Sequence, residues 1–265
     1  MAIANFADAE IYYEISGEGH PLVLIPGFAS GAWSWAWQVG SFSDRFRVIT
    51  FDPRGVSRST LSDGADVSIE AIADDVANLL DAIGLDSADV LGISFGGFVA
   101  QEFALKHPQR LGKLVLASTS FGGPNHIPPS AEVLAAFTAT DGLNTSERIG
   151  QYLTLAFSRE YAAANGAAVE RFCRLREENV VPRDVYMRQL QSAMDFDAED
   201  RIRKIAARTL VITGDDDTVV PPQNSRNLAA AIPNAGLKVI EGSGHMAFVE
   251  KAAEFNRIVR EFLQS

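Results

Sequence analysis

Short, continuously apolar runs alternate along this chain with segments in which apolar residues recur at helical spacing. The runs are expected to be strands buried on both faces, because a half-buried strand would alternate apolar and polar residues. They are "PLVLIPG" (21–27), "RVITFD" (47–52), "ADVLGIS" (88–94), "KLVLAST" (113–119), "TLVITG" (209–214) and "LKVIEG" (237–242). The helical segments are residues 68–84, 97–107, 225–232 and 251–263. This alternation predicts an α/β fold, with a mostly parallel twisted sheet flanked by helices on both faces.

The alternation is interrupted between residues 122 and 203. A stretch rich in glycine and proline, "FGGPNHIPPS", leads out of the strand pattern. Only helix-like segments follow, until "RTLVITG" resumes the strand pattern. We therefore predict a core formed by residues 1–121 and 204–265, with residues 122–203 inserted as a helical cap over the sheet.

Net charge and composition narrow the choice of partners and compartment. The chain carries 34 acidic and 23 basic residues, a formal net charge of −11, so no nucleic-acid partner is expected. Its one cysteine, Cys173, allows no internal disulfide, which fits a reducing compartment. No apolar run is long enough to span a membrane and the N-terminus has no basic start. A cytoplasmic protein with no membrane partner is therefore expected, and a homodimer is left open.

A serine flanked by glycines stands where the third apolar run meets the helix after it. In "LGISFGG", Gly92 and Gly96 lie two residues before and two residues after Ser94. A sharp strand-to-helix turn strains its central residue, and side chains at the two flanking positions would collide with the turn. Such a turn would present the Ser94 hydroxyl at the carboxyl edge of the sheet and place the Phe95 amide at a helix N-terminus. Ser94 is therefore the candidate nucleophile.

A serine hydroxyl needs a base to act as a nucleophile at neutral pH, and the base needs an orienting acid. Of the four histidines, only His245 follows a buried strand in a glycine-rich loop, "IEGSGHMAF". The acid is expected among Asp215, Asp216 and Asp217 in "TLVITGDDDTVVPP", directly after another buried strand. The resulting chain order, Ser, Asp, His, is the order found with a nucleophile elbow.

Together these motifs resemble the α/β-hydrolase family. The resemblance spans nearly the full chain, and its motifs are "LIPGFASGAWSW", "FDPRGVSRS", "LGISFGG", "TLVITGDDDTVVPP" and "GSGHMAF". Members of this family commonly place the acid three residues after the glycine that ends its strand and four residues before a proline. Counted from Gly214 and Pro221, both spacings imply Asp217, with Asp216 and Asp215 as the alternatives.

The resemblance also implies an oxyanion hole formed by two backbone N–H groups. Family members carry His-Gly-X after the early strand, and the amide of X is one of the donors. This chain has Pro-Gly-Phe at residues 26–28, which lacks the histidine side chain and keeps the Phe28 amide. The implied donors are therefore Phe28 and Phe95. Asp52 and Arg54, in the family turn "DPRG", are expected to hold loops together.

Residues in these roles imply hydrolysis of a small carboxylic ester or lactone through an acyl-enzyme. In the segments "SFGGFVAQ" and "LVLAST", the chain resembles 3-oxoadipate enol-lactonases. Relatives with this fold also act as carbon–carbon bond hydrolases or perhydrolases, or as small-molecule sensors with slow turnover, and these are the alternatives. No cofactor and no metal are expected, because the sequence lacks paired Cys/His clusters, a Walker loop and a dinucleotide fingerprint. The expected partner is a small-molecule ester or lactone substrate.

Aromatic and apolar side chains of the predicted cap are expected mainly to pack its helices onto the core. A few of them should line an apolar pocket above Ser94. Phe28, Phe95 and one of the tryptophans, with Trp33 as the candidate, are expected to complete this pocket. The cap residues concerned are Phe137, Tyr152, Leu153, Leu155, Phe157, Tyr161, Phe172, Tyr186, Met187 and Met194.

Three arginines of the cap, Arg171, Arg174 and Arg176, stand among glutamates in "VERFCRLREE". A solvated, salt-bridged helix face is the favoured interpretation of such a pattern. A site for a substrate carboxylate is the alternative. A small or medium-sized, mainly apolar acyl group is therefore predicted for the substrate.

Overall fold

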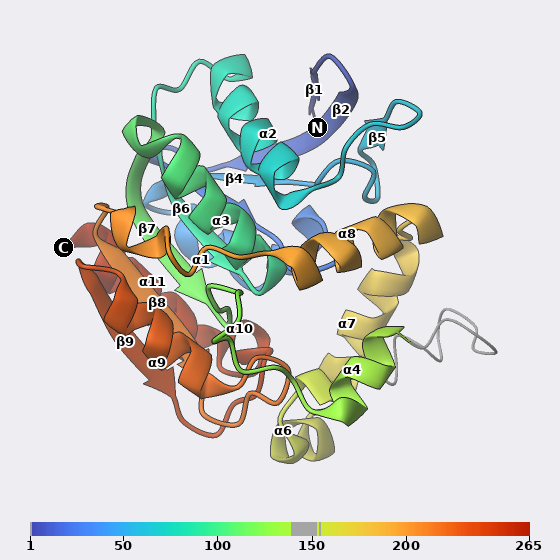
Figure 1. The fold of residues 1–265 in the computed structure, drawn as a ribbon, viewed down its shortest axis with the longest axis vertical. Coiled ribbons are helices and arrows are strands. Elements are labelled where there is room, and N and C mark those ends of the chain that lie inside the picture. The colour runs from blue at the N-terminus through green and yellow to red at the C-terminus, as the bar shows by residue number, and fades with distance from the viewer. Residues whose placement is uncertain (1, 139–152, 154) are drawn as a thin grey trace.

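The computed structural model describes residues 2–138, 153 and 155–265 (Figure 1). Its strands form one sheet in the order β1-β2-β4-β3-β6-β7-β8-β9, with β5 paired to β2. The strands are β1 (Ala2–Asn5), β2 (Ala9–Ser16), β3 (His20–Ile25), β4 (Phe46–Phe51), β5 (Thr60–Leu61), β6 (Ala88–Ile93), β7 (Leu111–Ala117), β8 (Thr209–Gly214) and β9 (Ala235–Ile240).

The sheet is mostly parallel, as predicted. The pairs from β4 through β3, β6, β7 and β8 to β9 are all parallel. Strand β2 pairs antiparallel with β1, β4 and β5, and this antiparallel edge was not predicted. The reason lies in the sequence of β2, "AEIYYEIS", which mixes acidic and apolar residues because its side chains are buried only in part.

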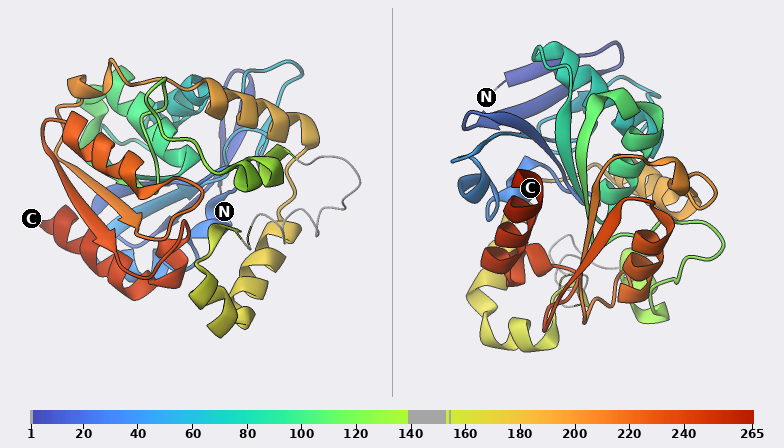
Figure 2. Two further views of the ribbon diagram at one scale, coloured as in Figure 1. Left: turned by 60° about the horizontal axis from the view of Figure 1, so that its bottom comes forward. Right: turned by 90° about the vertical axis from the view of Figure 1, so that its left-hand side faces the viewer.

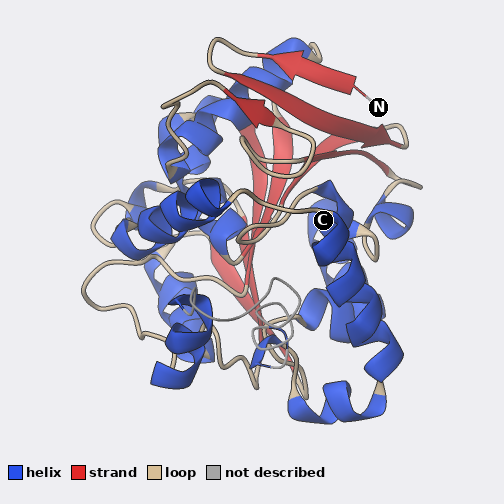
Figure 3. Ribbon diagram, turned by 90° about the vertical axis from the view of Figure 1, so that its right-hand side faces the viewer, coloured by secondary structure: helices blue, strands red, loops and turns tan. Residues whose placement is uncertain are grey.

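Helices cover both faces of the sheet (Figures 2 and 3), which confirms the predicted layers. The core contains α1 (Val39–Phe42), α2 (Ile69–Ala82), α3 (Phe95–Lys106), α9 (Pro222–Ala231), α10 (Ala247–Glu250) and α11 (Ala252–Gln264). Apolar residues of α2, α3 and α9 form one buried cluster with the sheet, and those of α1 and α11 form a second cluster on the opposite face. Among the described residues, no helix combines the length and the apolar character that crossing a membrane requires.

The strand order reverses beside β3. The chain passes from β3 to β4 on one side and then, by way of α2, to β6 on the other side of β3. The loops after β3 and β6 therefore leave the same edge of the sheet in opposite directions. Open α/β sheets bind ligands in the crevice at such a reversal, outside the carboxyl ends of the strands.

Residues 122–203, which we call the insertion, lie between β7 and β8. The described helices of this segment are α4 (Ala131–Thr138), α6 (Arg159–Ala164), α7 (Gly166–Glu178) and α8 (Arg183–Asp195). An antiparallel bridge between Gly122 and Asp197 joins the two ends of the insertion. Helix α8 packs against α2, and α7 packs against the 3₁₀ turn Ala32–Trp35. The insertion thus reaches the loops at the carboxyl edge of the sheet (Figure 1).

Candidate active site

Ser94 occupies a sharp turn between β6 and α3. Its backbone has φ 53° and ψ −119°, a conformation that costs free energy for a residue with a side chain. A Cβ atom on Gly92 would lie 2.2 Å from the Gly96 carbonyl oxygen, and one on Gly96 would lie 2.3 Å from the Ile25 carbonyl oxygen. Both flanking positions therefore require glycine, although the second clash is with the end of β3 and not with the turn itself.

A chain of hydrogen bonds joins Ser94 to His245 and His245 to Asp217. His245 Nε2 lies 3.0 Å from Ser94 Oγ, and His245 Nδ1 lies 2.9 Å from Asp217 Oδ2 and 3.1 Å from Oδ1. The His245 and Asp217 side chains are buried, with 2% and 0% of their surfaces exposed. Because an ionised carboxylate can only accept, Nδ1 carries the proton and Nε2 is left to accept one from the Ser94 hydroxyl.

The three consecutive aspartates after β8 have different environments. Asp217 is buried, and its Oδ1 also accepts hydrogen bonds from the backbone N–H groups of Val219 (3.0 Å) and Val220 (2.8 Å). Asp215 and Asp216 are exposed, and Asp215 accepts a hydrogen bond from the backbone N–H of Gly242. Of the three, only Asp217 lies within hydrogen-bond distance of His245 in the structure.

The loop after β3, with the predicted oxyanion donor Phe28, approaches Ser94 closely. A Cβ atom on Gly27 would lie 3.7 Å from the Ser94 Cβ. The insertion holds this loop, because the side chain of Gln189, on α8, accepts a hydrogen bond from the Ala29 N–H at 3.1 Å. The structure thus brings Phe28 to the nucleophile, and Phe95 follows Ser94 directly. Their role as oxyanion donors stays a prediction.

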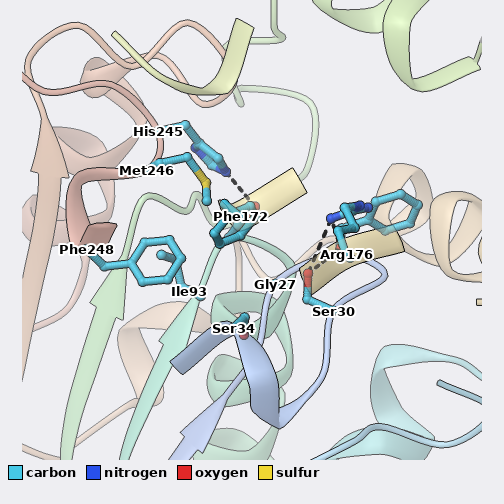
Figure 4. Close-up of a pocket in the computed structure, with 11 residues that line it drawn as sticks. Gly27, Ser30, Ser34, Ile93, Phe172, Arg176, His245, Met246 and Phe248 are labelled. Atoms are coloured by element: carbon cyan, nitrogen blue, oxygen red, sulfur yellow. Dashed lines mark hydrogen bonds between the residues drawn. The ribbon is translucent and has the colours of Figure 1, made fainter. Parts of the chain in front are cut away.

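A pocket opens beside Ser94 (Figure 4). Phe172, from α7, lines the pocket together with His245, and Arg176, one turn further along α7, faces Ser30. Most of the lining is apolar, as predicted. The lining residues are Gly27, Phe28, Ser30, Ser34, Ile93, Ser94, Phe172, Arg176, His245, Met246 and Phe248.

The tryptophan predicted for this pocket lies behind its wall. Trp33 is absent from the lining residues, and its indole ring packs edge-on against Phe172 with ring centroids 5.2 Å apart. The reason is that the Ala32–Trp35 turn points this side chain at α7, so Trp33 supports a residue of the wall. Phe95 is also outside the lining, and it packs edge-on against Phe28 at 6.2 Å.

Most of the cap aromatics do pack the helices together. Phe157 stacks on Tyr161 at 5.6 Å, and Tyr186 packs edge-on against Phe28 at 4.6 Å. Met187 and Met194 are exposed, against expectation, because they lie on the outer face of α8. The side chain of Phe137 and the whole of Tyr152 lie outside the described residues.

The three arginines of α7 have three different environments. Arg174 pairs with Glu170 at 3.0 Å on the surface, and Arg171 lies over the Trp37 ring at 5.0 Å from its centroid. Arg176 lines the pocket, and its Nη1 donates to the Phe28 carbonyl at 3.4 Å and to the Ser30 hydroxyl at 3.3 Å. The expectation of a salt-bridged surface therefore holds for Arg174, whereas Arg176 forms part of the pocket wall.

The family turn "DPRG" holds loops together, as predicted. Asp52 is buried, accepts a hydrogen bond from the Ala32 N–H at 2.8 Å and pairs with Arg58 at 2.7 Å. Arg54 pairs with buried Asp75 at 2.6 Å. These contacts fix the loops after β3 and β4 to each other and to α2.

Two groups beside the site were missed in the sequence. Gln189 lies in a polar helical segment that offers no signal, and only its contact with the loop after β3 reveals it. Glu250 accepts a hydrogen bond from the backbone N–H of Gly244, the residue before His245. Its position five residues after His245, next to an apolar stretch, was the only signal available.

Known proteins resemble this chain over almost its whole length. A family model described as the alpha/beta hydrolase fold matches residues 20–252. The chain is 32% identical over 260 residues to a putative carbamate hydrolase RutD of Caulobacter sp. (strain K31), covering 96% of this chain and 95% of that protein. It is 30% identical over 273 residues to a 2-hydroxy-6-oxo-6-phenylhexa-2,4-dienoate hydrolase of Comamonas testosteroni, covering 98% and 93%. The enol-lactonase of Burkholderia xenovorans LB400 shares the fold, with a TM-score of 0.86 at 24% identity and full coverage of both chains.

Proposed function

Because the chain belongs to the α/β-hydrolase fold family, we propose that it is a cofactor-independent serine hydrolase that cleaves a small carboxylic ester or lactone. The observation that carries this proposal is the hydrogen-bonded chain from Ser94 through His245 to buried Asp217. These three groups have the geometry that general-base activation of a serine requires.

In the proposed reaction, the Ser94 Oγ attacks the substrate carbonyl carbon while its proton passes to His245 Nε2. Asp217 keeps the imidazole in the correct tautomer and stabilises its charged form. The Phe28 and Phe95 N–H groups stabilise the tetrahedral oxyanion. When it collapses, the ester C–O bond breaks and His245 gives its proton to the departing alkoxide. Water, deprotonated by His245, then attacks the acyl-enzyme. The bond to Ser94 Oγ breaks, His245 returns the proton to that oxygen, and the acid product leaves.

The pocket supports a substrate with both an apolar part and a negatively charged group. Phe172, Met246 and Phe248 offer apolar surface beside Ser94. Arg176 places a guanidinium, a planar donor suited to a carboxylate, on the pocket wall. This proposal adds a negatively charged group to the mainly apolar acyl group predicted from sequence, because Arg176 lines the pocket.

Carbon–carbon bond hydrolysis is the second candidate. It is favoured by the 30% identity to the Comamonas testosteroni enzyme, whose name describes a ketonic dienoate hydrolase, together with the cation at Arg176. The same nucleophile and base would serve. The bond broken after attack would be C–C instead of C–O, and the departing carbanion would take the proton held by His245.

One panel of substrates tests both candidates. Neutral and carboxylate-bearing esters, lactones, a carbamate and a carbon–carbon hydrolase substrate would be assayed with wild type and with Ser94→Ala. The proposal expects rapid turnover of an ester or lactone that Ser94→Ala abolishes. Turnover of the ketonic dienoate alone would favour the second candidate. Stoichiometric binding without turnover of any member would favour a sensor.

A further inference from the structure

Glu250 is a buried carboxylate next to the site that the proposed reaction does not use. Only 8% of its surface is exposed. Its Oε1 accepts hydrogen bonds from the backbone N–H groups of Gly244 (3.0 Å) and Ser158 (3.2 Å), and its Oε2 accepts one from the Ser158 hydroxyl (2.7 Å). Gly244 directly precedes His245, whereas Ser158 lies in the insertion at the start of α6. One carboxylate therefore joins two regions that are distant in sequence.

The segment 155–158 of the insertion contacts both loops that carry the acid and the base. The Thr218 hydroxyl, next to Asp217, donates to the Leu155 carbonyl at 2.8 Å. The Met246 N–H, next to His245, donates to the Ala156 carbonyl at 3.2 Å. A Cβ atom on Gly244 would lie 2.7 Å from the Ser158 nitrogen, so this approach needs glycine. The Glu250 side chain adds to these backbone contacts, because it binds both Gly244 and Ser158.

The loop that carries His245 is held by hydrogen bonds to other segments, such as the one from the Gly242 N–H to Asp215 at its start. Its sequence, "EGSGH", contains two glycines, and Gly242 adopts φ 62°. Glycines give the backbone conformational freedom, so the orientation of His245 depends on the bonds made by its neighbours. Glu250 supplies such a bond one residue before His245.

The carboxylate stays at this position although its surroundings oppose its charge. Burial raises the pKa of Glu250, the nearby negative charge of Asp216 adds to the rise, and the hydrogen bonds from Ser158 and Gly244 lower the pKa. Tyr161, on α6, also lies within reach of this charge. A group that is unfavourable to bury, yet accepts three hydrogen bonds beside the base, is suited to a role in positioning.

We propose that Glu250 is a positioning residue that fixes the His245 loop to the insertion and so keeps His245 Nε2 on the Ser94 hydroxyl. This inference rests on the proposed function, in which His245 activates Ser94. It ties the insertion to the chemistry, because the same carboxylate binds the residue that begins α6.

Three variants separate geometry from charge. Glu250→Gln loses the charge but keeps the reach, because its amide oxygen can accept from both N–H groups and its NH₂ can donate to the Ser158 hydroxyl. Glu250→Asp keeps the charge, but its shorter side chain cannot reach the same hydrogen-bond partners. Glu250→Ala loses both. Asp89→Ala is the control, because Asp89 is also a buried carboxylate that accepts a backbone N–H, from Lys113, on β6 at the end remote from Ser94.

The measurements are kcat and KM for a small neutral ester and the rate at which a small serine-directed phosphonate labels Ser94. We expect Glu250→Ala and Glu250→Asp to lower kcat and the labelling rate together by about ten- to a hundredfold with little change in KM, as small misplacements of a catalytic group do. Glu250→Gln should stay within about threefold of wild type, since its hydrogen bonds are retained. The control Asp89→Ala should lower thermal stability and leave the labelling rate unchanged.

Labelling of Glu250→Ala at the wild-type rate would overturn the inference. So would a Glu250→Asp variant that is faster than Glu250→Gln, because the charge and not the geometry would then matter. If the alanine variant does not fold, the order of the Gln and Asp variants decides. Failure of the phosphonate to label wild type at Ser94 would instead overturn the proposed function itself.

Discussion

The carboxyl edge of the sheet and the insertion contribute to one pocket in different ways. At the sheet edge, Asp217 and His245 are almost fully buried and hydrogen-bonded to each other, and His245 also contacts Ser94. The insertion contributes side chains of one helix, Phe172 and Arg176, that lie over the pocket. The groups of a buried polar network must keep one hydrogen-bonded arrangement. Side chains on a helix that covers a pocket can be substituted with little loss of stability. We therefore propose that the edge supplies the reacting groups and that the insertion selects the substrate and helps to position the edge loops through Gln189 and Ser158.

The largest effect is expected at the nucleophile. Ser94→Ala should leave the fold intact and lower kcat by about a millionfold, because the proposed acyl-enzyme forms on the Ser94 hydroxyl. Ser34→Ala is the matched control, since Ser34 lines the same pocket but donates its hydroxyl to the Gly31 carbonyl. Mass spectrometry after phosphonate treatment should find the label on Ser94 alone. A label on another serine would refute the assignment.

The next largest effect is expected at the acid. Asp217→Asn should lower kcat by about ten-thousandfold, because an amide stabilises the wrong tautomer of His245. Asp216→Asn, on an exposed neighbour, should have a much smaller effect on kcat in the same assay. If Asp216→Asn were the more damaging change, the orienting acid would not be the one that contacts His245.

A variant on the insertion side tests whether that region is limited to selection. Gln189→Leu removes the acceptor for the Ala29 N–H, so the loop with Phe28 should shift and kcat should fall by about tenfold. Gln189→Glu keeps an acceptor and should retain most of the activity. Gln191→Leu, on the same helix but exposed and bonded to Asp195, is the surface control. If kcat were unchanged in Gln189→Leu, the contact between the insertion and the loop that contains Phe28 would not contribute to the chemical step.

Substrate selection is tested at Arg176. Arg176→Met should raise KM for a carboxylate-bearing ester by about tenfold, the loss of one charge-assisted contact, and leave a neutral ester of equal size nearly unaffected. Arg174→Met is the control, because Arg174 pairs with Glu170 on the outer surface of the same helix. Equal changes for the charged and the neutral ester would mean that Arg176 acts on the shape of the pocket only.

The smallest effect is a dependence of stability on pH. Burial raises the pKa of Glu250 above its ordinary value of 4.5, so the folded protein holds this proton more tightly than the unfolded chain. The contribution of protonated Glu250 to the free energy of unfolding is therefore fully present below that ordinary value. It is lost as the pH rises through the pKa of Glu250 in the folded protein. Thermal unfolding should show Glu250→Gln equal to wild type at about pH 4 and increasingly more stable toward neutral pH.

A neighbouring charge provides the control for this dependence. Asp216→Asn removes a charge that adds to the rise in the pKa of Glu250, so in that background the pH-dependent gain from Glu250→Gln should shrink. A wild type that gains stability relative to Glu250→Gln as pH rises would show the opposite sign, and would contradict a raised pKa.

Much of the core could be predicted because its signals are local. The apolar run at residues 209–214 is strand β8 with the same bounds, and the predicted helix at 97–107 is α3, which begins at Phe95. Strands buried on both faces must be continuously apolar, and a nucleophile turn must have glycines where a Cβ atom would clash. Ser94 follows such a run, whereas the strand before His245, β9, lies at the edge of the sheet and is only partly buried, against expectation. The convergence of Ser94 and His245 at one edge followed from a parallel sheet.

The sequence by itself determined a parallel α/β core, the candidate nucleophile and base, and a short choice of acids. Only the tertiary structure decided which side chains surround them. Burial of one aspartate out of three, the guanidinium of Arg176 in the pocket and the bonds of Gln189 and Glu250 all depend on contacts between distant segments. Gln189 and Ala29 are 160 positions apart, and Ser158 and Glu250 are 92 positions apart. No local pattern encodes such pairs, because the partner of a polar side chain is set by how the insertion folds back over the sheet edge.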